Sequence, residues 1–586
     1  MRTYAESASQ HVGEAIEVKG WVNSRRDHGG LIFIDIRDHT AILQLVIHPE
    51  TAEAFKLAEQ LRDEFVIKAT GTVSERAEGL KNPNIPTGGV ELLVTELELL
   101  NRSEPLPFQV DTQQNISEEM RLKYRYLDLR RAKMQNMLKK RAQYYSMMRK
   151  YLEGREFIEV ATPILANSSP EGARDFLIPS RVHPGKFYAL PQAPQQFKQL
   201  LMVGGVPRYY QIAACFRDED PRADRLYGEF YQLDLEMSFV EDGEEIRSIM
   251  EPLIKDLATS FAGKKLLSED IPRITYQEAM DRYGSDKPDL RFGMELVDLS
   301  ETLKNCGFGV FKSVLDNGGR VKAICVKGAA ALSRSQIDKF TEVAKNEGAG
   351  GLAYLTYEGG EVKSPITKFF SPEELQAIQD ATGAQDGDAV FFGSDKREVV
   401  NKVLGRLRNE FATHFELKDP NVIALAWIVD FPFYEWDDKA NKLDFGHNPF
   451  SMPKGGVEGL DAEDKLAIVA DQYDMVANGY EICSGAVRNH NPEIMYKAFG
   501  SLGYNMEYVD RKFGAMINAF KFGAPPHAGC AFGIDRLFMV LMSEDNIREI
   551  VAFPKNGSGV DVMMNSPSIV EDYQVKELGI QVLPQE

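Results

Sequence analysis

Two arginines occur in segments whose residue types suit the binding of an anionic substrate. Arg217 opens the charged run RDED, which lies between the apolar stretches 209–214 and 230–239. Arg536 follows a glycine-rich stretch and precedes an apolar one. Because a guanidinium group offers a planar fork of donors that matches phosphate and carboxylate oxygens, both arginines are candidates for binding such groups.

Further polar residues and glycines accompany the two arginines. Polar and apolar residues alternate over 230–239, so Gln232 and Asp234 point the same way and present acceptors to one pocket. Gly529 and Gly533 would let a flat ligand approach the backbone closely. A single Asp-Arg pair, as at the start of the apolar stretch, is more often a structural ion pair. The Asp-Arg pair therefore indicates a ligand-binding site only in combination with the other segments.

The elements that must position these residues are two strands joined by a charged loop and, farther along, a strand that runs into a helix. Upstream, apolar residues at spacings of three and four predict a long helix over 133–153, and a strand follows over 157–165. Pro163 within that strand indicates a sheet edge or an interface. From about 272 to 415 strands and helices alternate without chemically suggestive segments, which predicts an inserted domain.

The pattern of strands in the N-terminal sequence predicts a small barrel. Five short strands with a helix after the third follow the order of an OB fold, which often binds single-stranded nucleic acid. Strand alternation places Ile32, Ile34 and Ile36 on the core face and turns Phe33 to the other face. There Phe33 could stack on a base or pack under a neighbouring loop, and both alternatives stay open at this point. The strands are expected at 16–22, 31–37, 42–47, 65–73 and 90–100, and the helix at 51–62.

Composition narrows the class of protein. The 586 residues suggest three or four domains, and 43% hydrophobic with 27% charged residues is typical of a soluble globular chain. With 68 basic and 88 acidic residues the net charge of −20 counts against nucleic-acid binding overall, but it does not describe a local surface. Without a long apolar run or a signal-like N-terminus, we expect no membrane association and a cytoplasmic location. Five scattered cysteines argue against a disulfide framework or a structural zinc.

Several segments, in their order along the chain, carry a resemblance to a known family. The helix with Pro163, the FRDE loop at 216–219 and the GIDR run at 533–536 resemble motifs 1, 2 and 3 of class II aminoacyl-tRNA synthetases. Segments 169–175, 192–199, 445–450 and 479–488 resemble the aspartyl members of that class. The barrel in front, the insertion and the C-terminal extension are similar to the bacterial form.

The resemblance implies a multidomain α+β fold: an OB-fold β-barrel, a catalytic core built on an antiparallel sheet, and an inserted α/β domain. It also implies a homodimer, through motif 1. The implied domains are an OB-fold anticodon-binding domain at 1–105, a hinge at 106–132, the first part of the core with motifs 1 and 2 at 133–271, the inserted bacterial-type domain at 272–417, the second part of the core with motif 3 at 418–560, and the C-terminal extension at 561–586.

The resemblance implies ATP-dependent attachment of L-aspartate to tRNA through an aspartyl-adenylate. Arg217 and Arg536 would be the catalytic residues, holding the α- and γ-phosphates of ATP with adenine between Arg536 and Phe230. Asp474 and Glu481 would carry Mg²⁺, which prefers carboxylate and phosphate oxygens. The other implied ATP-binding residues are Asp218, Glu219, Gly533, Ile534 and Asp535. No side chain need act as nucleophile, because the substrate carboxylate itself attacks the α-phosphorus.

For aspartate, the resemblance implies that Lys198 and Arg488 grip the side-chain carboxylate with His447 beside them, and that Arg217 also contacts the amino acid. Acceptors for the α-ammonium would come from Glu171, Gln195, Gln232 and Asp234. His527 is expected to be structural. One departure is that the motif 2 loop at 223–230 is one residue longer than usual, so Leu226 and Tyr227 are assigned no ligand contact.

In the barrel, the resemblance assigns Arg26, Phe33 and Gln44 to the anticodon and favours the outward position of Phe33. His28 and Gly79 match forms that accept both tRNA(Asp) and tRNA(Asn), which would require a downstream amidotransferase. The alternatives are an enzyme restricted to tRNA(Asp), a non-catalytic RNA-binding paralogue, and an asparaginyl enzyme. Lys198 argues against the last, because its charge would face a neutral amide.

Overall fold

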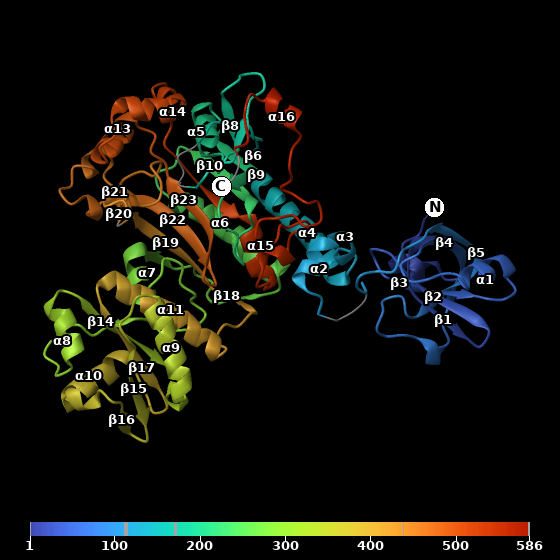
Figure 1. The fold of residues 1–586 in the computed structure, drawn as a ribbon, viewed down its shortest axis with the longest axis horizontal. Coiled ribbons are helices and arrows are strands. Elements are labelled where there is room, and N and C mark those ends of the chain that lie inside the picture. Colours follow the sequence, from blue (N-terminus) through green and yellow to red (C-terminus); the bar gives the residue numbers. More distant parts are fainter. Residues whose placement is uncertain (1, 111–114, 169–172, 438, 584–586) are drawn as a thin grey trace. The chain divides into compact units, whose positions relative to one another are not determined.

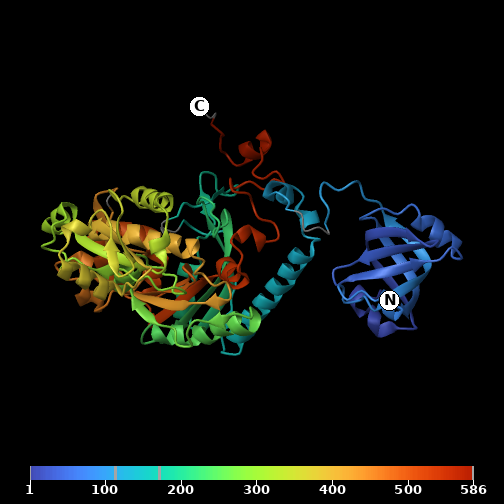
Figure 2. The same cartoon turned by 90° about the horizontal axis from the view of Figure 1, so that it is seen from below.

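The computed structural model describes residues 2–110, 115–168, 173–437 and 439–583. The chain divides into two compact units, the first made of Met1–Lys140 with Asp561–Met564 and the second of Arg141–Val560 with Asn565–Glu586. Figures 1 and 2 show the elements of each unit, which are described separately below. Among the described residues no helix is long and apolar enough to span a membrane.

The first unit contains a closed five-stranded barrel with strand order β1-β2-β3-β5-β4, visible in blue in Figure 1. A short helix, α1, lies between the third and fourth strands, so the predicted OB-fold order is confirmed. Ile32, Ile34 and Ile36 are buried in the barrel core, whereas Phe33 lies on the outer face and is half-buried. The bounds are β1 Ala15–His28, β2 Leu31–Arg37, β3 Ile42–Ile47, α1 Ala52–Ala58, β4 Val66–Glu75 and β5 Val90–Asn101.

After the barrel come two short helices, α2 (Glu118–Lys123) and α3 (Arg125–Asp128), and the long helix α4 (Ala132–Glu153). The helix predicted over 133–153 is confirmed. Among the apolar residues of this helix, Met134, Met148 and Leu152 are buried, whereas Ala142 is exposed.

The second unit is built on an eight-stranded sheet with the order β12-β19-β22-β23-β24-β10-β9-β6. Its six central strands are antiparallel to their neighbours, and only the edge strands β12 and β6 pair in parallel. The bounds are β12 Arg273–Thr275, β19 Leu425–Pro432, β22 Val469–Ala477, β23 Tyr480–Val487, β24 His527–Gly533, β10 Gly228–Ser238, β9 Arg208–Arg217 and β6 Ile158–Glu159. The strand predicted over 157–165 lies at the sheet edge as expected, but its length was wrong, because only two residues pair.

A separate five-stranded sheet, β13-β14-β17-β15-β16, lies within the second unit and is coloured yellow-green in Figure 1. Helices cover both of its faces, and each face has its own apolar core. The bounds are β13 Val297–Asp298, α8 Gly309–Asp316, β14 Arg320–Val326, α9 Arg334–Asn346, β15 Ala353–Glu358, β16 Glu361–Lys363, α10 Pro372–Thr382, β17 Ala389–Asp395 and α11 Arg397–His414. The range 272–417 proposed for the insertion thus includes β12, which belongs to the large sheet.

Shorter elements complete the second unit. The helices are α5 Gln195–Val203, α6 Glu244–Asp256, α7 Tyr276–Tyr283, α12 Gly456–Gly459, α13 Pro492–Ser501, α14 Met506–Phe520, α15 Ile534–Met542 and α16 Asp572–Glu577. The two-stranded pairs are β7 Leu177–Pro179 with β8 Phe187–Ala189, β11 Lys265–Leu266 with β18 Val422–Ile423, and β20 Tyr434–Asp437 with β21 Lys442–Phe445.

Candidate functional site

A pocket of about 430 Å³ lies on the central strands of the large sheet. The predicted hairpin of β9 and β10 supplies one side, and β23, β24 and the start of α15 supply the other. Nine of the predicted site residues line this pocket together: Arg217, Glu219, Phe230, Gln232, His447, Glu481, Gly533, Asp535 and Arg536. Arg217 and Arg536 are far apart in sequence but line one pocket, because β10 lies between β9, which ends at Arg217, and β24, which runs into α15 and Arg536.

The two arginines keep unused donors. The guanidinium of Arg217 lies 5.1 Å from the ring centroid of Phe230, and its Nε is buried without a hydrogen-bond partner among the described residues. Arg536 donates to the backbone oxygen of Glu481 at 2.8 Å and pairs with Asp224 at 3.2 Å, and its Nε also has no described partner. Buried guanidinium donors left free in this way suit an anionic ligand.

The remaining residues of motifs 2 and 3 are held by protein contacts. Asp535 accepts from Arg141 of α4 and from the backbone N–H of Tyr231 at 3.2 Å, which ties the start of α15 to β10. Ile534 is fully buried. Glu219 pairs with Arg225 within the loop. These contacts show packing roles, and the predicted ATP contacts of Asp535, Ile534 and Glu219 stay predictions.

Leu226 and Tyr227, the two residues of the longer motif 2 loop that were assigned no ligand contact, have different surroundings. Leu226 lines the pocket, whereas Tyr227 turns away from it. The Tyr227 hydroxyl donates to Asp218 at 3.2 Å, and its ring packs edge-on against Phe176. The aspartate predicted to touch ATP is thereby bound to the tyrosine of the loop.

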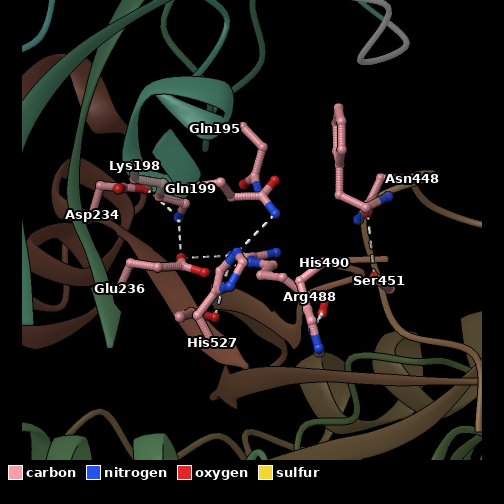
Figure 3. A network of polar contacts seen from close by, with 12 residues as sticks. Gln195, Lys198, Gln199, Asp234, Glu236, Asn448, Ser451, Arg488, His490 and His527 are labelled. Atoms are coloured by element: carbon pink, nitrogen blue, oxygen red, sulfur yellow. Dashed lines mark hydrogen bonds and ion pairs between the residues drawn. The ribbon is translucent and has the colours of Figure 1, made fainter. Parts of the chain in front are cut away.

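Beside the pocket lies a buried network of two cations and two carboxylates (Figure 3). Lys198 Nζ lies 2.7 Å from Asp234 Oδ2 and 3.3 Å from Glu236 Oε2. Arg488 Nε donates to Glu236 Oε1 at 2.9 Å. All four side chains are at most 5% exposed, so their charges are compensated chiefly by one another.

Burial raises the pKa of Asp234 although Lys198 opposes the shift. For Glu236 burial acts in the same direction, but Arg488 and Lys198 outweigh it and lower the pKa. Oδ1 of Asp234 is buried without a described partner, which leaves an acceptor for a ligand. The network therefore combines an ionised carboxylate between two cations with a second carboxylate that has a free oxygen.

Two glutamines predicted to contact the amino acid behave differently. Gln232 lines the pocket and accepts from the Cys215 thiol at 3.2 Å. Gln195 instead donates to Gln199 at 3.0 Å, and Gln199 contacts His527 Nε2 at 3.0 Å (Figure 3). Glu171 lies outside the described residues.

Burial lowers the pKa of His527, and desolvation within the pocket lowers the pKa of His447, whose side chain is partly open to solvent. His447 lines the pocket, and its Nε2 lies 3.5 Å from the hydroxyl of Ser484. His527 is fully buried at the start of β24 and contacts the backbone oxygen of Pro525 at 2.8 Å. The expectation that His527 is structural agrees with this burial.

Asp474 and Glu481, on the neighbouring strands β22 and β23, form the predicted metal pair. Burial and then Glu481 raise the pKa of Asp474, whose Oδ1 has no described partner. For Glu481 burial acts upward, but Lys287 and Arg536 lower its pKa. The described residues hold no group of three or more His, Cys, Asp or Glu that could bind a metal. Two carboxylates fit a divalent cation that takes further oxygens from a nucleotide.

Sequence reasoning missed two residues of this region. Glu236 stands one strand period beyond Asp234, so the alternation that selected Gln232 and Asp234 could have found it. Lys287 lies in the range expected to carry no chemistry, yet it lines the pocket. The expectation of no chemistry in this range was therefore wrong for Lys287, which sequence reasoning missed because no local pattern marks this residue.

Gly529 has a different role from the one predicted. A Cβ at this position would lie 2.0 Å from Glu236 Oε2 and 2.2 Å from the backbone oxygen of Leu235. Glycine is thus required here by the close approach of β10 and its carboxylate, and the prediction of ligand approach was wrong. At Gly533 only Arg536 comes near, at 3.9 Å, and the residue lines the pocket.

The barrel has its own cavity of about 560 Å³, lined by Arg26 and Gln44 among others. Arg26 donates to Asp35 at 3.2 Å and to Gln44 at 3.3 Å. Phe33 pairs with Arg26 across β1 and β2. His28 and Gly79 are exposed, and no atom of the described residues lies within 4 Å of a Cβ built on Gly79, so packing among them does not demand glycine there.

Comparisons with known proteins agree with this architecture. Residues 117–557 match the family described as tRNA synthetases class II (D, K and N), and residues 16–100 match the OB-fold nucleic acid binding domain. The chain is 52% identical over 575 residues to an aspartate--tRNA(Asp/Asn) ligase of Chlorobaculum parvum, covering 98% of this chain and 95% of the relative. A protein of the same name from Rickettsia felis is 51% identical over 578 residues, covering 98% and 96%.

Solved structures show the same fold at lower identity. Asparaginyl-tRNA synthetase from Pyrococcus horikoshii, complexed with asparaginyl-adenylate, has a TM-score of 0.58 at 19% identity and covers 94% of this chain and 98% of its own. A putative aspartyl-tRNA synthetase from Leishmania major has a TM-score of 0.58 at 18% identity, with coverage of 95% and 93%.

Proposed function

This chain belongs to the class II tRNA synthetases (D, K and N), and we propose that it attaches L-aspartate to both tRNA(Asp) and tRNA(Asn) through an aspartyl-adenylate. The observation that carries the choice of amino acid is the buried network in which Lys198 and Arg488 flank Glu236. Relatives at 52% and 51% identity named aspartate--tRNA(Asp/Asn) ligase support the same choice.

The charges of the network favour an acidic amino acid. The side-chain carboxylate of aspartate would contact Lys198 and Arg488, and its α-ammonium would find the free oxygen of Asp234 and the amide of Gln232. Asparagine would present a neutral amide to the same buried cations, and a neutral acceptor forms weaker hydrogen bonds with them than a carboxylate does. Selection of aspartate thus follows from charge complementarity in a site shielded from water.

Arg217 and Arg536 would bind the phosphates of ATP, with the adenine between Arg536 and the ring of Phe230. Asp474 and Glu481 would hold Mg²⁺, which supplies positive charge to the phosphates when bound. The α-carboxylate of aspartate attacks the α-phosphorus, the bond between the α- and β-phosphates breaks and pyrophosphate leaves. The side chains accelerate the step by positioning both substrates and compensating their charge. The adenylate then passes its aminoacyl group to the terminal ribose of tRNA.

In the barrel, Arg26, Phe33 and Gln44 would read the anticodon, and His28 with Gly79 would admit both tRNAs. The direct test is charging of purified tRNA(Asp) and tRNA(Asn) transcripts with radioactive aspartate. We expect both to be charged, with Asp-tRNA(Asn) then passing to an amidotransferase. Charging of tRNA(Asp) alone would refute the dual specificity, and charging of neither would refute the proposed activity.

We also propose that the enzyme is a cytoplasmic homodimer. The segment after α4, which resembles motif 1, exposes Ile158, Ile164 and Leu165 at about half of their side-chain surface. Exposed apolar residues beside an edge strand suit a subunit interface, which in obligate dimers is large and apolar. Light scattering should give twice the chain mass of 65.8 kDa, whereas a mass near 65.8 kDa would contradict the dimer.

A further inference from the structure

Lys287 brings a positive charge into the pocket from the segment 284–293, which follows α7. Its Nζ lies 3.1 Å from Glu481 Oε2 and 3.4 Å from Asp286. It lines the same pocket as Arg217 and Arg536, and its side chain is 42% exposed, so the ammonium group is accessible to a ligand. The proposed reaction assigns no role to Lys287.

The segment that carries Lys287 is held firmly by α11 of the insertion. Arg408, only 1% exposed, donates to the backbone oxygens of Asp289 at 2.7 Å and Phe292 at 3.0 Å. At the start of the segment, Gly284 has a φ of 68°, and a Cβ there would lie 2.1 Å from the backbone oxygen of Asn401. A buried arginine and a close helix contact therefore fix the backbone, from which the side chain of Lys287 reaches Glu481 in the pocket.

The ammonium group of Lys287 lies beside Glu481, where a divalent cation would bind together with the substrates. Without substrate, its ammonium group compensates the carboxylate of Glu481, the residue proposed to hold a divalent cation. A cation arriving there would repel the ammonium group, and a long flexible lysine can turn to a nearby anion. Asp286, 3.4 Å away, is one such anion, and the polyphosphate would be another, because Arg217 and Arg536 line the same pocket.

We propose that Lys287 is a further substrate-binding residue, which contacts the phosphate oxygens of ATP and of the pyrophosphate product and releases Glu481 to the metal. The proposal rests on the proposed adenylation activity and adds a residue delivered by the inserted domain. It explains why α11 fixes this segment beside the catalytic pocket.

The test compares Lys287→Gln, Lys287→Arg and a control, Lys304→Gln, whose exposed lysine pairs with Glu301 elsewhere in the insertion. ATP binding is measured by calorimetry without amino acid or tRNA, with and without Mg²⁺. We expect Lys287→Gln to weaken ATP binding about tenfold in both conditions, the size of one lost charge-assisted hydrogen bond. Lys287→Arg should restore most of the affinity, and the control should bind as the wild type.

Two further measurements distinguish a role of Lys287 in substrate binding from a purely structural role. In aspartate-dependent ATP–pyrophosphate exchange, the Lys287→Gln variant should raise KM for ATP and leave KM for aspartate unchanged. Its dissociation constant for Mn²⁺ without ATP should fall, because Glu481 loses a competing cation. ATP and Mn²⁺ binding equal to the wild type would overturn the proposal. Failure of the wild type to charge tRNA would instead refute the proposed function, since calorimetry involves neither aspartate nor tRNA.

Discussion

Glu236 is the anion on which the buried network depends. It lies 2.9 Å from Arg488 and 3.3 Å from Lys198, and removal of one partner leaves buried charge without compensation. We expect Glu236→Gln to lower the free energy of unfolding by about 3 kcal/mol and to raise KM for aspartate. Urea denaturation and pyrophosphate exchange measure the two effects.

A matched control lies on the same strand. Glu229 is 59% exposed, and its oxygen is 3.8 Å from Lys555. Because exposed pairs contribute little, Glu229→Gln should change the free energy of unfolding by less than about 1 kcal/mol. Equal effects of the two substitutions would show that the Glu236 network does not stabilise the fold.

His527 predicts a dependence of stability on pH. Burial lowers its pKa in the folded protein, whereas an unfolded chain binds the proton with a pKa near 6.5. As the pH falls below about 6.5, the unfolded state gains the proton first, and the free energy of unfolding decreases by up to about 1.4 kcal/mol per pH unit.

The comparison is between the wild type and His527→Gln, each unfolded in urea at pH 7.5 and 5.5. The wild type should lose more stability between these two pH values than the variant, whatever their difference at pH 7.5. An identical loss in both proteins would contradict a buried neutral histidine at this position.

At the residue scale, site residues that follow the alternation of a strand could be predicted from the sequence. Site residues whose role depends on neighbours distant in the sequence could not. Gln232 was placed in the pocket by strand alternation alone, and Glu236 lay within reach of the same rule. Lys287 was out of reach, because its importance comes from α11 and β23, which contact its segment from elsewhere in the sequence. Gly529 was misread for the same reason: the atoms that exclude a Cβ belong to β10.

At the scale of elements, the motif 2 loop is held on its outer side by the segment 551–560. Gly559 has a φ of 75°, and a Cβ there would lie 3.0 Å from the ring of Tyr227. The Gly559→Ala substitution would cost about 1 kcal/mol, because alanine disfavours a left-handed backbone conformation. Its Cβ would also press against the ring of Tyr227, so we expect the loop to shift. We expect KM for ATP in pyrophosphate exchange to rise about fivefold.

The neighbouring Gly557 offers the control. In the part of the chain that the structure describes, nothing lies within 4 Å of a Cβ built at Gly557, so Gly557→Ala should leave KM for ATP unchanged. If both variants retained the wild-type value, the contact of Tyr227 with Gly559 would have no part in holding the loop.

Elements with a strong local pattern were predicted well, including four of the five barrel strands, α4 and the strand–helix junction at Arg536. The first barrel strand, expected at 16–22, was underestimated, because β1 extends to His28. The strand over 157–165 was overestimated, because a run of exposed apolar residues and a buried strand look alike in sequence. The start of the insertion was obscured because β12 pairs with β19, some 150 residues later, and a parallel edge pairing leaves no local signal.

At the scale of the whole molecule, the two proposed sites belong to different units. The barrel cavity lies entirely within the first unit, and the ATP pocket lies entirely within the second. Each unit has its own apolar core, so a substitution on the barrel surface should not disturb the geometry of the ATP pocket. Effects on tRNA recognition and on adenylation can therefore be separated.

Phe33→Ala tests this separation. Loss of one stacked base costs about 1–3 kcal/mol, so kcat/KM for tRNA charging should fall at least about fivefold. ATP–pyrophosphate exchange, which requires no tRNA, should keep its wild-type rate. Phe369→Ala, which removes an exposed aromatic ring from the insertion, should change neither measurement. A loss of exchange activity in Phe33→Ala would mean that the barrel acts on adenylation, and an unchanged charging rate would remove Phe33 from anticodon recognition.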